Sequence, residues 1–151
     1  MLKIKLVSKR KLITKVKLTK DTFVQQKIKT MKRDNIIYWV TTGMVAMAMA
    51  FSSYMYLSKN PELMNNFKTL GYPEYFVSML GIAKLLGAIA LLIPALDKIK
   101  EWAYAGFTFT FIGATYTHIA TNTPFVGPII ILIVLGISYW FRGRLKIQTG
   151  S

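Results

Sequence analysis

Four long apolar stretches, interrupted by a single charged residue, constrain this chain more than any other feature of its sequence. They run over Ile36–Leu57, Tyr75–Leu96, Trp102–Ala120 and Phe125–Phe141, and the charge inside them is Lys84. Each stretch holds 17 to 22 residues, and about 17–25 helical residues cross the roughly 30 Å core of a bilayer. Backbone amides inside lipid must be hydrogen-bonded internally, so we expect helices rather than strands. The sequence therefore predicts an all-α integral membrane protein, a bundle of four transmembrane helices.

The composition supports this class and excludes several kinds of chemistry. Core helices of a soluble domain are the alternative, but 53% apolar residues with one charge in four runs leave little polar surface to face water. With no cysteine, disulfides, thiolate metal sites and dithiol relays are excluded. The single histidine, His118, excludes a bis-histidine haem in one chain. All six carboxylates lie outside the apolar stretches, so we expect no buried metal site.

Positive charge is concentrated before the first apolar stretch. Residues 1–35 carry twelve Lys/Arg and two Asp (12 − 2 = +10), whereas the other residues carry eight Lys/Arg and four acids (8 − 4 = +4). Because this block directly precedes a membrane helix, we interpret it as contacting anionic lipid headgroups rather than nucleic acid. Its alternating apolar residues have no partner strand, so we expect it to be mobile, or helical only from about Thr22. Met31 is an alternative start, which would make residues 1–30 an extension.

These features divide the chain into a basic cytoplasmic tail over 1–34, a four-helix domain over 35–144 and a short tail over 145–151. Lys and Arg flank the start of the first stretch, the Asp97–Glu101 loop and the end of the fourth stretch. The Ser58–Glu74 loop has balanced charges, and Thr121–Pro124 has none. The excess of positive charge predicts that both termini are cytoplasmic. Within Ser58–Glu74, Pro61 starts a predicted amphipathic helix on the outer surface.

Small residues form a stripe on each of two neighbouring helices, which predicts a close seam between them. The third stretch has Gly106, Thr110 and Gly113 at helical spacing, and the second stretch has the stripe Ala83, Gly87, Ala90 and Pro94. Small residues let membrane helices approach closely, which matters because lipid provides no hydrophobic driving force between helices. We predict that the helix-packing residues are Gly81, Gly87, Gly106, Thr110 and Gly113, and a substrate groove along the seam is the alternative.

Lys84 is the principal candidate for a ligand-binding residue. Insertion of a lysine near the middle of a membrane helix costs a free energy of roughly 2.5–3.5 kcal/mol on insertion scales. Such residues usually face the bundle interior or a water-filled cavity. The alternative is a lysine that extends its ammonium to the interface. His118 lies in the same outer half, with Tyr116 and Thr115 beside it, and a hydrogen-bonded structural role is its alternative. We predict that Lys84, His118, Tyr116 and Thr115 line one outward-opening cavity.

Four segments together resemble the DoxX-like family of small four-helix membrane proteins. They are Gly71-Tyr72-Pro73, the run from Gly81 through Lys84 to Pro94, the run from Leu96 to Phe107, and the run from Gly113 to Ala120. The resemblance covers about Met31 to Arg144. Relatives often have an acid where this chain has Thr110, so a role for that acid does not transfer.

The resemblance implies a protein of the bacterial inner membrane, in a family named after subunits linked to a quinone-reducing sulfur oxidoreductase. Three functions remain open. The first is a small-ligand-binding protein or an accessory subunit with a membrane partner or a second copy, and the second is a quinone-linked oxidoreductase subunit. The third is a small transporter, which would need an internal repeat or broken helices. No motif indicates an independent catalytic activity, and a quinone is the one cofactor that such an apolar site could accept.

Overall fold

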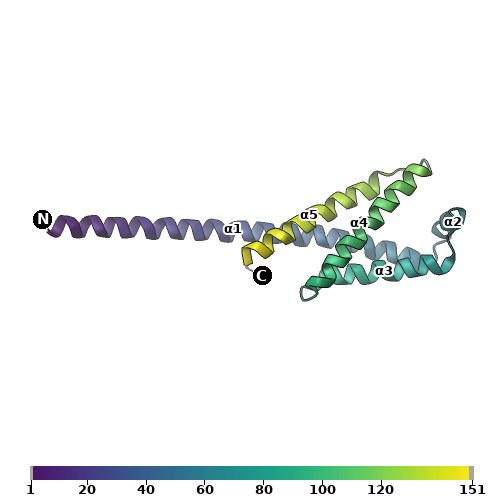
Figure 1. Cartoon of the computed structure of the whole chain (residues 1–151), viewed down its shortest axis with the longest axis horizontal. Helices are drawn as coiled ribbons and strands as arrows, with labels where there is room; N and C mark the ends of the chain where they lie inside the picture. Colours follow the sequence, from purple (N-terminus) through teal and green to yellow (C-terminus); the bar gives the residue numbers. More distant parts are fainter. Residues whose placement is uncertain (1, 150–151) are drawn as a thin grey trace.

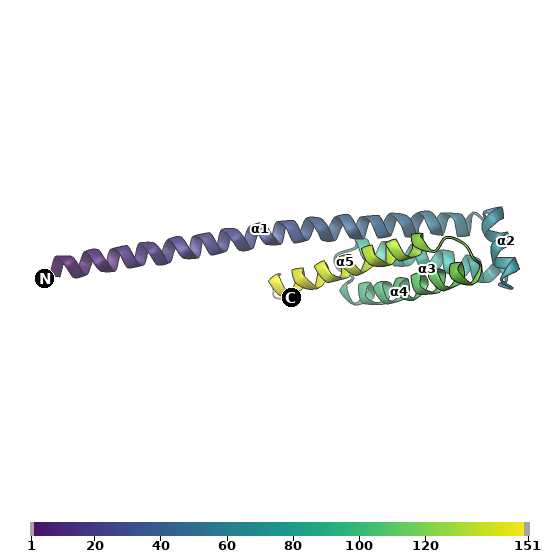
Figure 2. The ribbon, with the colours of Figure 1, turned by 90° about the horizontal axis from the view of Figure 1, so that it is seen from above.

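The protein consists entirely of helices over the part of the chain that the structure describes. The computed structural model describes residues 2–149, with side chains described at Lys15 and over residues 17–148. The helices are α1 (Leu2–Leu57), α2 (Pro61–Thr69), α3 (Glu74–Leu92), α4 (Asp97–Ala120) and α5 (Val126–Thr149). The predicted all-α class is confirmed. Successive long helices run in opposite directions, and the short α2 lies across one end of the group (Figures 1 and 2).

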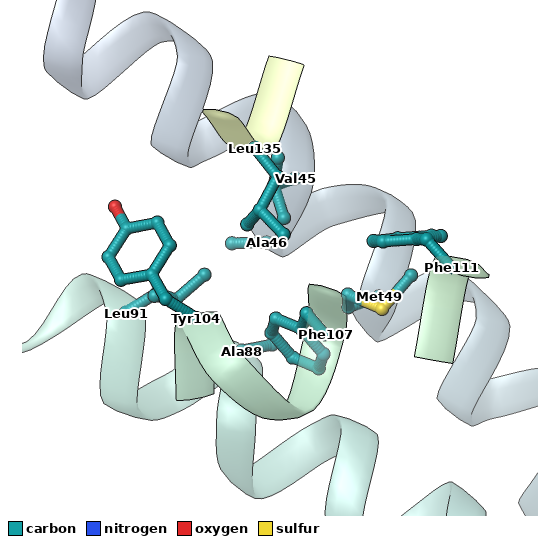
Figure 3. Packing of buried hydrophobic residues seen from close by; sticks show 9 residues of the cluster. All are labelled: Val45, Ala46, Met49, Ala88, Leu91, Tyr104, Phe107, Phe111 and Leu135. Carbon is teal, nitrogen blue, oxygen red and sulfur yellow. The ribbon is translucent and has the colours of Figure 1, made fainter. Parts of the chain in front are cut away.

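The four long helices pack in a ring in which each contacts two neighbours. Helix α1 packs against α3 and α5, and α4 packs against the same two helices. Buried side chains from all four helices form one central cluster, in which Phe107 and Phe111 of α4 lie close to Met49 of α1 (Figure 3). The members of this cluster are Val45, Ala46, Met49, Ala88, Leu91, Tyr104, Phe107, Phe111 and Leu135.

Three of the described helices are long and apolar enough to cross a membrane. The candidate spans lie within Lys17–Leu57 of α1, at Glu74–Leu92 of α3 and at Val126–Gln148 of α5. Helix α4 has 24 residues, which is sufficient length, but its threonines and His118 make it less apolar than the other three. The composition of the helices thus supports three of the four predicted spans directly.

Helix α1 extends far beyond the bundle at its N-terminal end. It is continuous from Leu2 to Leu57, so the expectation that helix begins only at about Thr22 is wrong. Residues 2–42 contain no glycine or proline, and a helix nucleated inside the bundle can propagate through them. The described side chains from Lys15 to Lys29 are all exposed. The basic segment is therefore a helical arm that projects away from the other helices (Figure 2).

Two helix boundaries differ from those expected, and a proline and an acidic first turn account for the differences. Helix α3 ends at Leu92 rather than Leu96, since Pro94 disfavours helical geometry at Ile93, which is extended (φ −87°, ψ 113°). Asp97–Glu101, expected to be a loop, forms the first turn of α4, where an acidic residue interacts favourably with the helix dipole. The connection between α3 and α4 is therefore shorter than expected and makes the two helices direct neighbours.

The predicted helix within Ser58–Glu74 is confirmed as α2. The side-chain oxygen of Asn60 accepts hydrogen bonds from the backbone N–H groups of Glu62 and Leu63, at 3.1 and 3.2 Å, and Pro61 begins the helix. At its end, Gly71 adopts a positive φ of 79°, which a side chain would disfavour. Helix α2 is thereby held across the ends of α1 and α3.

Candidate functional site

Lys84 lies inside the bundle but makes no ion pair among the described residues. Its side chain comes from the middle of α3, and the residue is only 9% exposed. Its ammonium donates a hydrogen bond of 2.9 Å to the hydroxyl of Ser52 and lies 3.7 Å from the centre of the Tyr56 ring. Both partners belong to α1 and both are uncharged. A positive charge is thus held by a hydroxyl and an aromatic face.

The aromatic surroundings of Lys84 continue into α2. The ring of Tyr56 meets Phe67 of α2 edge-on, with ring centres 5.5 Å apart. Phe67 in turn contacts Tyr72, which stacks on Phe76 with ring centres 5.0 Å apart. This chain of four rings covers the α2 end of the α1/α3 pair, so the Lys84 site lies beneath a cap of aromatic side chains.

The other predicted ligand-binding residues make separate contacts at the end of α4. The Nδ1 atom of His118 lies 2.7 Å from the hydroxyl oxygen of Thr123 and so holds the turn that follows α4. Thr115 donates to the carbonyl of Phe111, and Tyr116 is 74% exposed. No described interaction joins any of these residues to Lys84. The structure therefore gives Lys84 partners on α1 instead of the expected partners on α4.

Gly87 of α3 packs against α4, as the predicted seam requires, whereas Gly81 packs against α1 and the predicted glycines of α4 make no close contact. A Cβ atom added to Gly87 would lie 2.6 Å from Cζ of Phe107, and one added to Gly81 would lie 2.9 Å from Cβ of Tyr56. By contrast, Gly106 and Gly113 of α4 have nothing within 4 Å of an added Cβ. The hydroxyl of Thr110 bonds only to the carbonyl of Gly106. Helix α4 turns Phe107 and Phe111 inward, and Phe107 fills the space left by Gly87 on α3.

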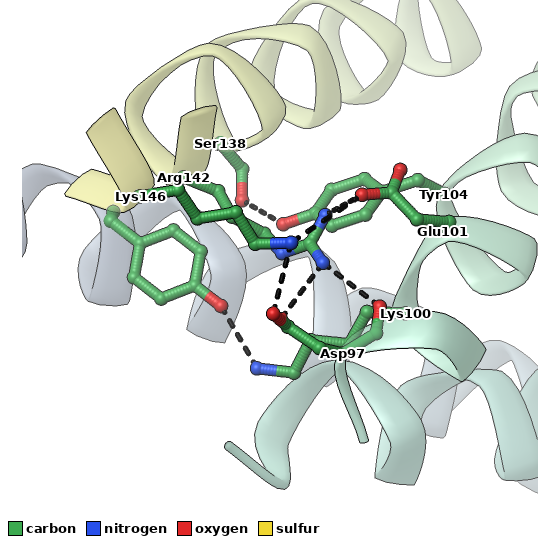
Figure 4. A network of polar contacts seen from close by, with 8 residues as sticks. Asp97, Lys100, Glu101, Tyr104, Ser138, Arg142 and Lys146 are labelled. Atoms are coloured by element: carbon green, nitrogen blue, oxygen red, sulfur yellow. Dashed lines mark hydrogen bonds and ion pairs between the residues drawn. The ribbon is translucent and has the colours of Figure 1, made fainter. Parts of the chain in front are cut away.

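A second polar cluster lies at the opposite end of the bundle and joins α4 to α5. The guanidinium of Arg142 is buried between Asp97 and Glu101, both of which accept hydrogen bonds from it (Figure 4). Lys146 adds an ion pair of 2.9 Å to Asp97. With Lys146 and the buried Arg142, the two half-exposed acids form a charge-balanced network, which is typical of a structural contact between helices.

Hydroxyl groups extend this network into the bundle. The hydroxyl of Ser138 lies 2.7 Å from those of both Thr42 and Tyr104, so it links α1, α4 and α5. Beside this trio, the ammonium of Lys100 donates to the hydroxyl of Tyr38 at 3.1 Å. All five side chains are buried. Each has a described hydrogen-bond partner, as buried polar groups require.

The carboxylates of this cluster are stabilised in their charged form. Hydrogen bonds from Lys146 and then Arg142 lower the pKa of Asp97 below its ordinary value. Burial alone would raise the pKa of Glu101, but the hydrogen bond and charge of Arg142 outweigh it, and the pKa is lowered. Burial, reinforced by Arg142, lowers the pKa of Lys100. The cluster therefore favours charged acids at neutral pH.

Asp34, at the base of the α1 arm, contacts the end of α5. It is fully buried, forms an ion pair of 3.1 Å with the guanidinium of Arg144 and accepts a hydrogen bond of 3.0 Å from the side chain of Gln148. Its Oδ1 atom and Oε1 of Gln148 have no described hydrogen-bond partner. The N-terminal and C-terminal parts of the bundle are thus joined at the end that also holds Arg142.

A comparison with protein-family models adds an independent finding. The model of the DoxX-like family matches residues 40–141, which is about two thirds of the chain. The chain belongs to the DoxX-like family. Comparison with curated proteins and with solved structures gives no match.

In this DoxX-like protein the matched segment contains Lys84, its partners on α1 and the two acids of the Arg142 cluster, whereas Arg142 and Lys146 lie just beyond its end. The arm before residue 40 lies outside it. Asp34 and the last turns of α5 also lie outside it, so the contact between Asp34 and Gln148 is not covered by the family match.

Several buried polar residues were not predicted, although the sequence contains a signal for them. On α1, Asp34, Tyr38, Thr42 and Ser53 share one helix face with apolar core residues such as Val45. A polar residue that recurs at the spacing of a buried stripe is expected to find a partner across the interface. The spacing marks these residues as buried, but it does not say which helix provides the partner.

Proposed function

We propose that this DoxX-like protein spans the bacterial inner membrane four times, with both termini in the cytoplasm, and binds a small ligand at Lys84. The single observation that carries the ligand-binding role is the pairing of a buried ammonium with two neutral groups, Ser52 and Tyr56. A buried charge without a counter-ion is costly, and an anionic or polar ligand would relieve that cost. In this view the protein is a binding or accessory subunit of a membrane complex.

The hydrogen bonding of α4 supports a fourth span despite its polarity. Its 24 residues would extend about 36 Å at 1.5 Å per residue. Four of its threonines each donate to the carbonyl four residues earlier, at 2.8–2.9 Å, so their hydroxyls need no water. These residues are Thr108, Thr110, Thr115 and Thr117. The helix also lies between α3 and α5, both of which are candidate spans.

The distribution of charge supports the proposed orientation. The base of the arm, the start of α4 and the end of α5 all lie at one end of the bundle, where Asp34 contacts Arg144 and Arg142 contacts Asp97. The excess of Lys and Arg at this end favours the cytoplasmic side. A headgroup layer is roughly 5–8 Å thick, whereas residues 2–30 of the arm extend about 42 Å. Contact with anionic lipid would thus involve only the last turns of the arm, near Lys27–Arg33.

The apolar core does not favour a transport pathway through the bundle. The central cluster that contains Met49, Phe107 and Leu135 separates the Lys84 site from the Arg142 cluster. Within residues 2–149 the four long helices are unbroken, whereas transporter sites are typically formed by discontinuous helices. A binding role agrees better with this arrangement than transport.

Native mass spectrometry of the full chain, purified from its membrane with lipid retained, tests the proposal. We expect the wild-type protein to carry an additional non-protein mass that Lys84→Met loses, whereas Lys68→Met keeps it. Lys68 is the matched control because it lies at the same end of the bundle and pairs on the surface with Glu74. A bound quinone would favour the oxidoreductase alternative, and a protein partner would identify the complex. A mass that Lys84→Met retains, or no mass in any variant, would contradict ligand binding at Lys84.

A further inference from the structure

The ammonium of Lys84 lies beside the last two turns of α1, near the end of that helix. Its Cα is ten residues from the start of α3, which corresponds to about 15 Å. Its partners Ser52 and Tyr56 lie in the last two turns of α1, which ends at Leu57. The charge is within about 8 Å of the end of α1 along the helix axis.

The charge balance around Lys84 differs from that of its neighbours at the same end. Lys59 and Lys68 both pair with Glu74, each at 3.5 Å. Lys84 forms none of the ion pairs found among the described side chains, and only one of its three N–H donors has a hydrogen-bonding partner. The site therefore holds one uncompensated positive charge and free donor capacity beneath an aromatic cap.

We propose that this site binds the monoanionic head group of an amphiphile, whose apolar chain lies along the bilayer-facing side of the α1/α3 pair. This inference rests on the proposed function and names the class of its ligand. One ammonium balances one negative charge, whereas a dianion would leave a net charge in a low-dielectric site. An oxyanion accepts charge-assisted hydrogen bonds from the free N–H donors, and the Ser52 hydroxyl supplies a further polar contact.

The position of the charge explains why an amphiphile fits better than a small soluble anion. The ammonium lies below the end of the bundle and is surrounded by the rings of Tyr56 and, beyond it, Phe67. Leu85, which follows Lys84 on α3, is an exposed apolar residue. A ligand that reaches Lys84 from the bilayer can keep its chain in lipid while its head replaces water at the ammonium.

Binding of defined probes to the full chain in neutral phosphatidylcholine nanodiscs tests the class of ligand. Oleate and oleyl alcohol share one chain and differ in head-group charge, and phosphatidylglycerol offers a monoanionic phosphodiester. Native mass spectrometry should show binding of an anionic probe that weakens about tenfold or more in Lys84→Met. Binding of oleyl alcohol should be weak and equal in both proteins. Lys68→Met should behave as wild type, and Ser52→Ala should weaken binding less than Lys84→Met does.

The outcomes separate this inference from the proposed function. A Lys84-dependent preference for oleate would identify a ligand of the fatty acid type. A Lys84-dependent preference for phosphatidylglycerol would identify a phospholipid. Both outcomes support a ligand with a monoanionic head group. Equal binding of oleate and oleyl alcohol would overturn the inference, even if the purified protein carries a Lys84-dependent mass. Anionic probes that bind Lys84→Met and wild type equally would also overturn it. If Lys84→Met does not fold, unchanged probe binding by Ser52→Ala overturns it instead.

Discussion

Gly87 of α3 lies directly against the ring of Phe107 of α4. A Cβ atom on Gly87 would come within 2.6 Å of Cζ of that ring, which is closer than real Cβ contacts allow. Phe107 is itself buried in the central cluster and has little room to move. The contact between α3 and α4 therefore depends on a glycine facing an aromatic ring, and the glycines of α4 take no part in it.

Replacement of this glycine should destabilise the bundle. We expect Gly87→Leu to lower the free energy of unfolding by on the order of 1–3 kcal/mol, because the added side chain overpacks the α3/α4 contact. Gly113→Leu is the matched control, since its Cβ would enter open space. Thermal unfolding in detergent measures both. Equal loss of stability in the two variants would contradict the observed seam.

The Arg142 cluster should make stability sensitive to acid. The folded state lowers the pKa values of Asp97 and Glu101, so their contribution is complete above the ordinary carboxylate range, near pH 4. It is lost as the pH falls through the lowered values, because the unfolded state then binds more protons. The thermal midpoint should therefore fall below about pH 4 in the wild type. Arg142→Gln should be less stable at pH 7 by on the order of 1–3 kcal/mol and should show a smaller additional loss in acid.

Lys98→Gln is the control for that measurement. Lys98 is exposed at the same end of the bundle, so its replacement removes one positive charge without touching the cluster. We expect its acid profile to match that of the wild type. An Arg142→Gln profile identical to both would show that the ion pairs do not contribute to the pH dependence.

The proposed orientation predicts the location of two reporter fusions. A reporter joined at Gly150 should be active only as a cytoplasmic reporter, and one inserted at Asn65 in α2 only as an external reporter. Asn65 is exposed on the helix that lies across the opposite end of the bundle. An external C-terminus or an internal Asn65 would contradict the four-span topology.

Deletion of residues 1–30 should leave the bundle intact. The described side chains of Lys15 and of residues 17–29 are exposed, whereas Asp34, which contacts Arg144 and Gln148, is retained. We expect the thermal midpoint in detergent to change by no more than the error of the measurement. Asp34→Ala in the full chain is the comparison and should be clearly destabilising, since it leaves Arg144 and Gln148 without their buried acceptor. A large loss of stability on truncation would show that the arm packs against the bundle.

Much of the secondary structure followed from local features of the sequence. The position of α2 was predicted from Pro61, because proline acts on its own backbone neighbours. The end of α3 was predicted four residues too late, although Pro94 acts on Ile93 in the same local way. The full length of α1 did not follow, since a Lys-rich segment has no apolar face of its own. It is helical here as a continuation of a helix that the bundle stabilises.

The candidate site depended on information that the sequence does not contain. The unusual nature of Lys84 is visible in the sequence, because a charge in an apolar run is rare whichever way the helix faces. Its partners are not visible, since a residue at one helix position can face either of two neighbouring helices. The expected pairing with His118 assumed that Lys84 faces α4, whereas rotation of α3 directs it to Ser52 and Tyr56 on α1.

The sequence by itself determined the all-α class, the apolar helices, the short helix α2 and the uneven charge, because each depends on composition or on residues close in the chain. Only the tertiary structure decided which faces meet. It set Phe107 against Gly87, joined Thr42 to Ser138 and left Gly113 exposed. The physical reason is that the rotation of each membrane helix is set by the fit of side chains across the interface. Lipid solvates every apolar helix face about equally well, so it does not determine which face packs against which neighbouring helix.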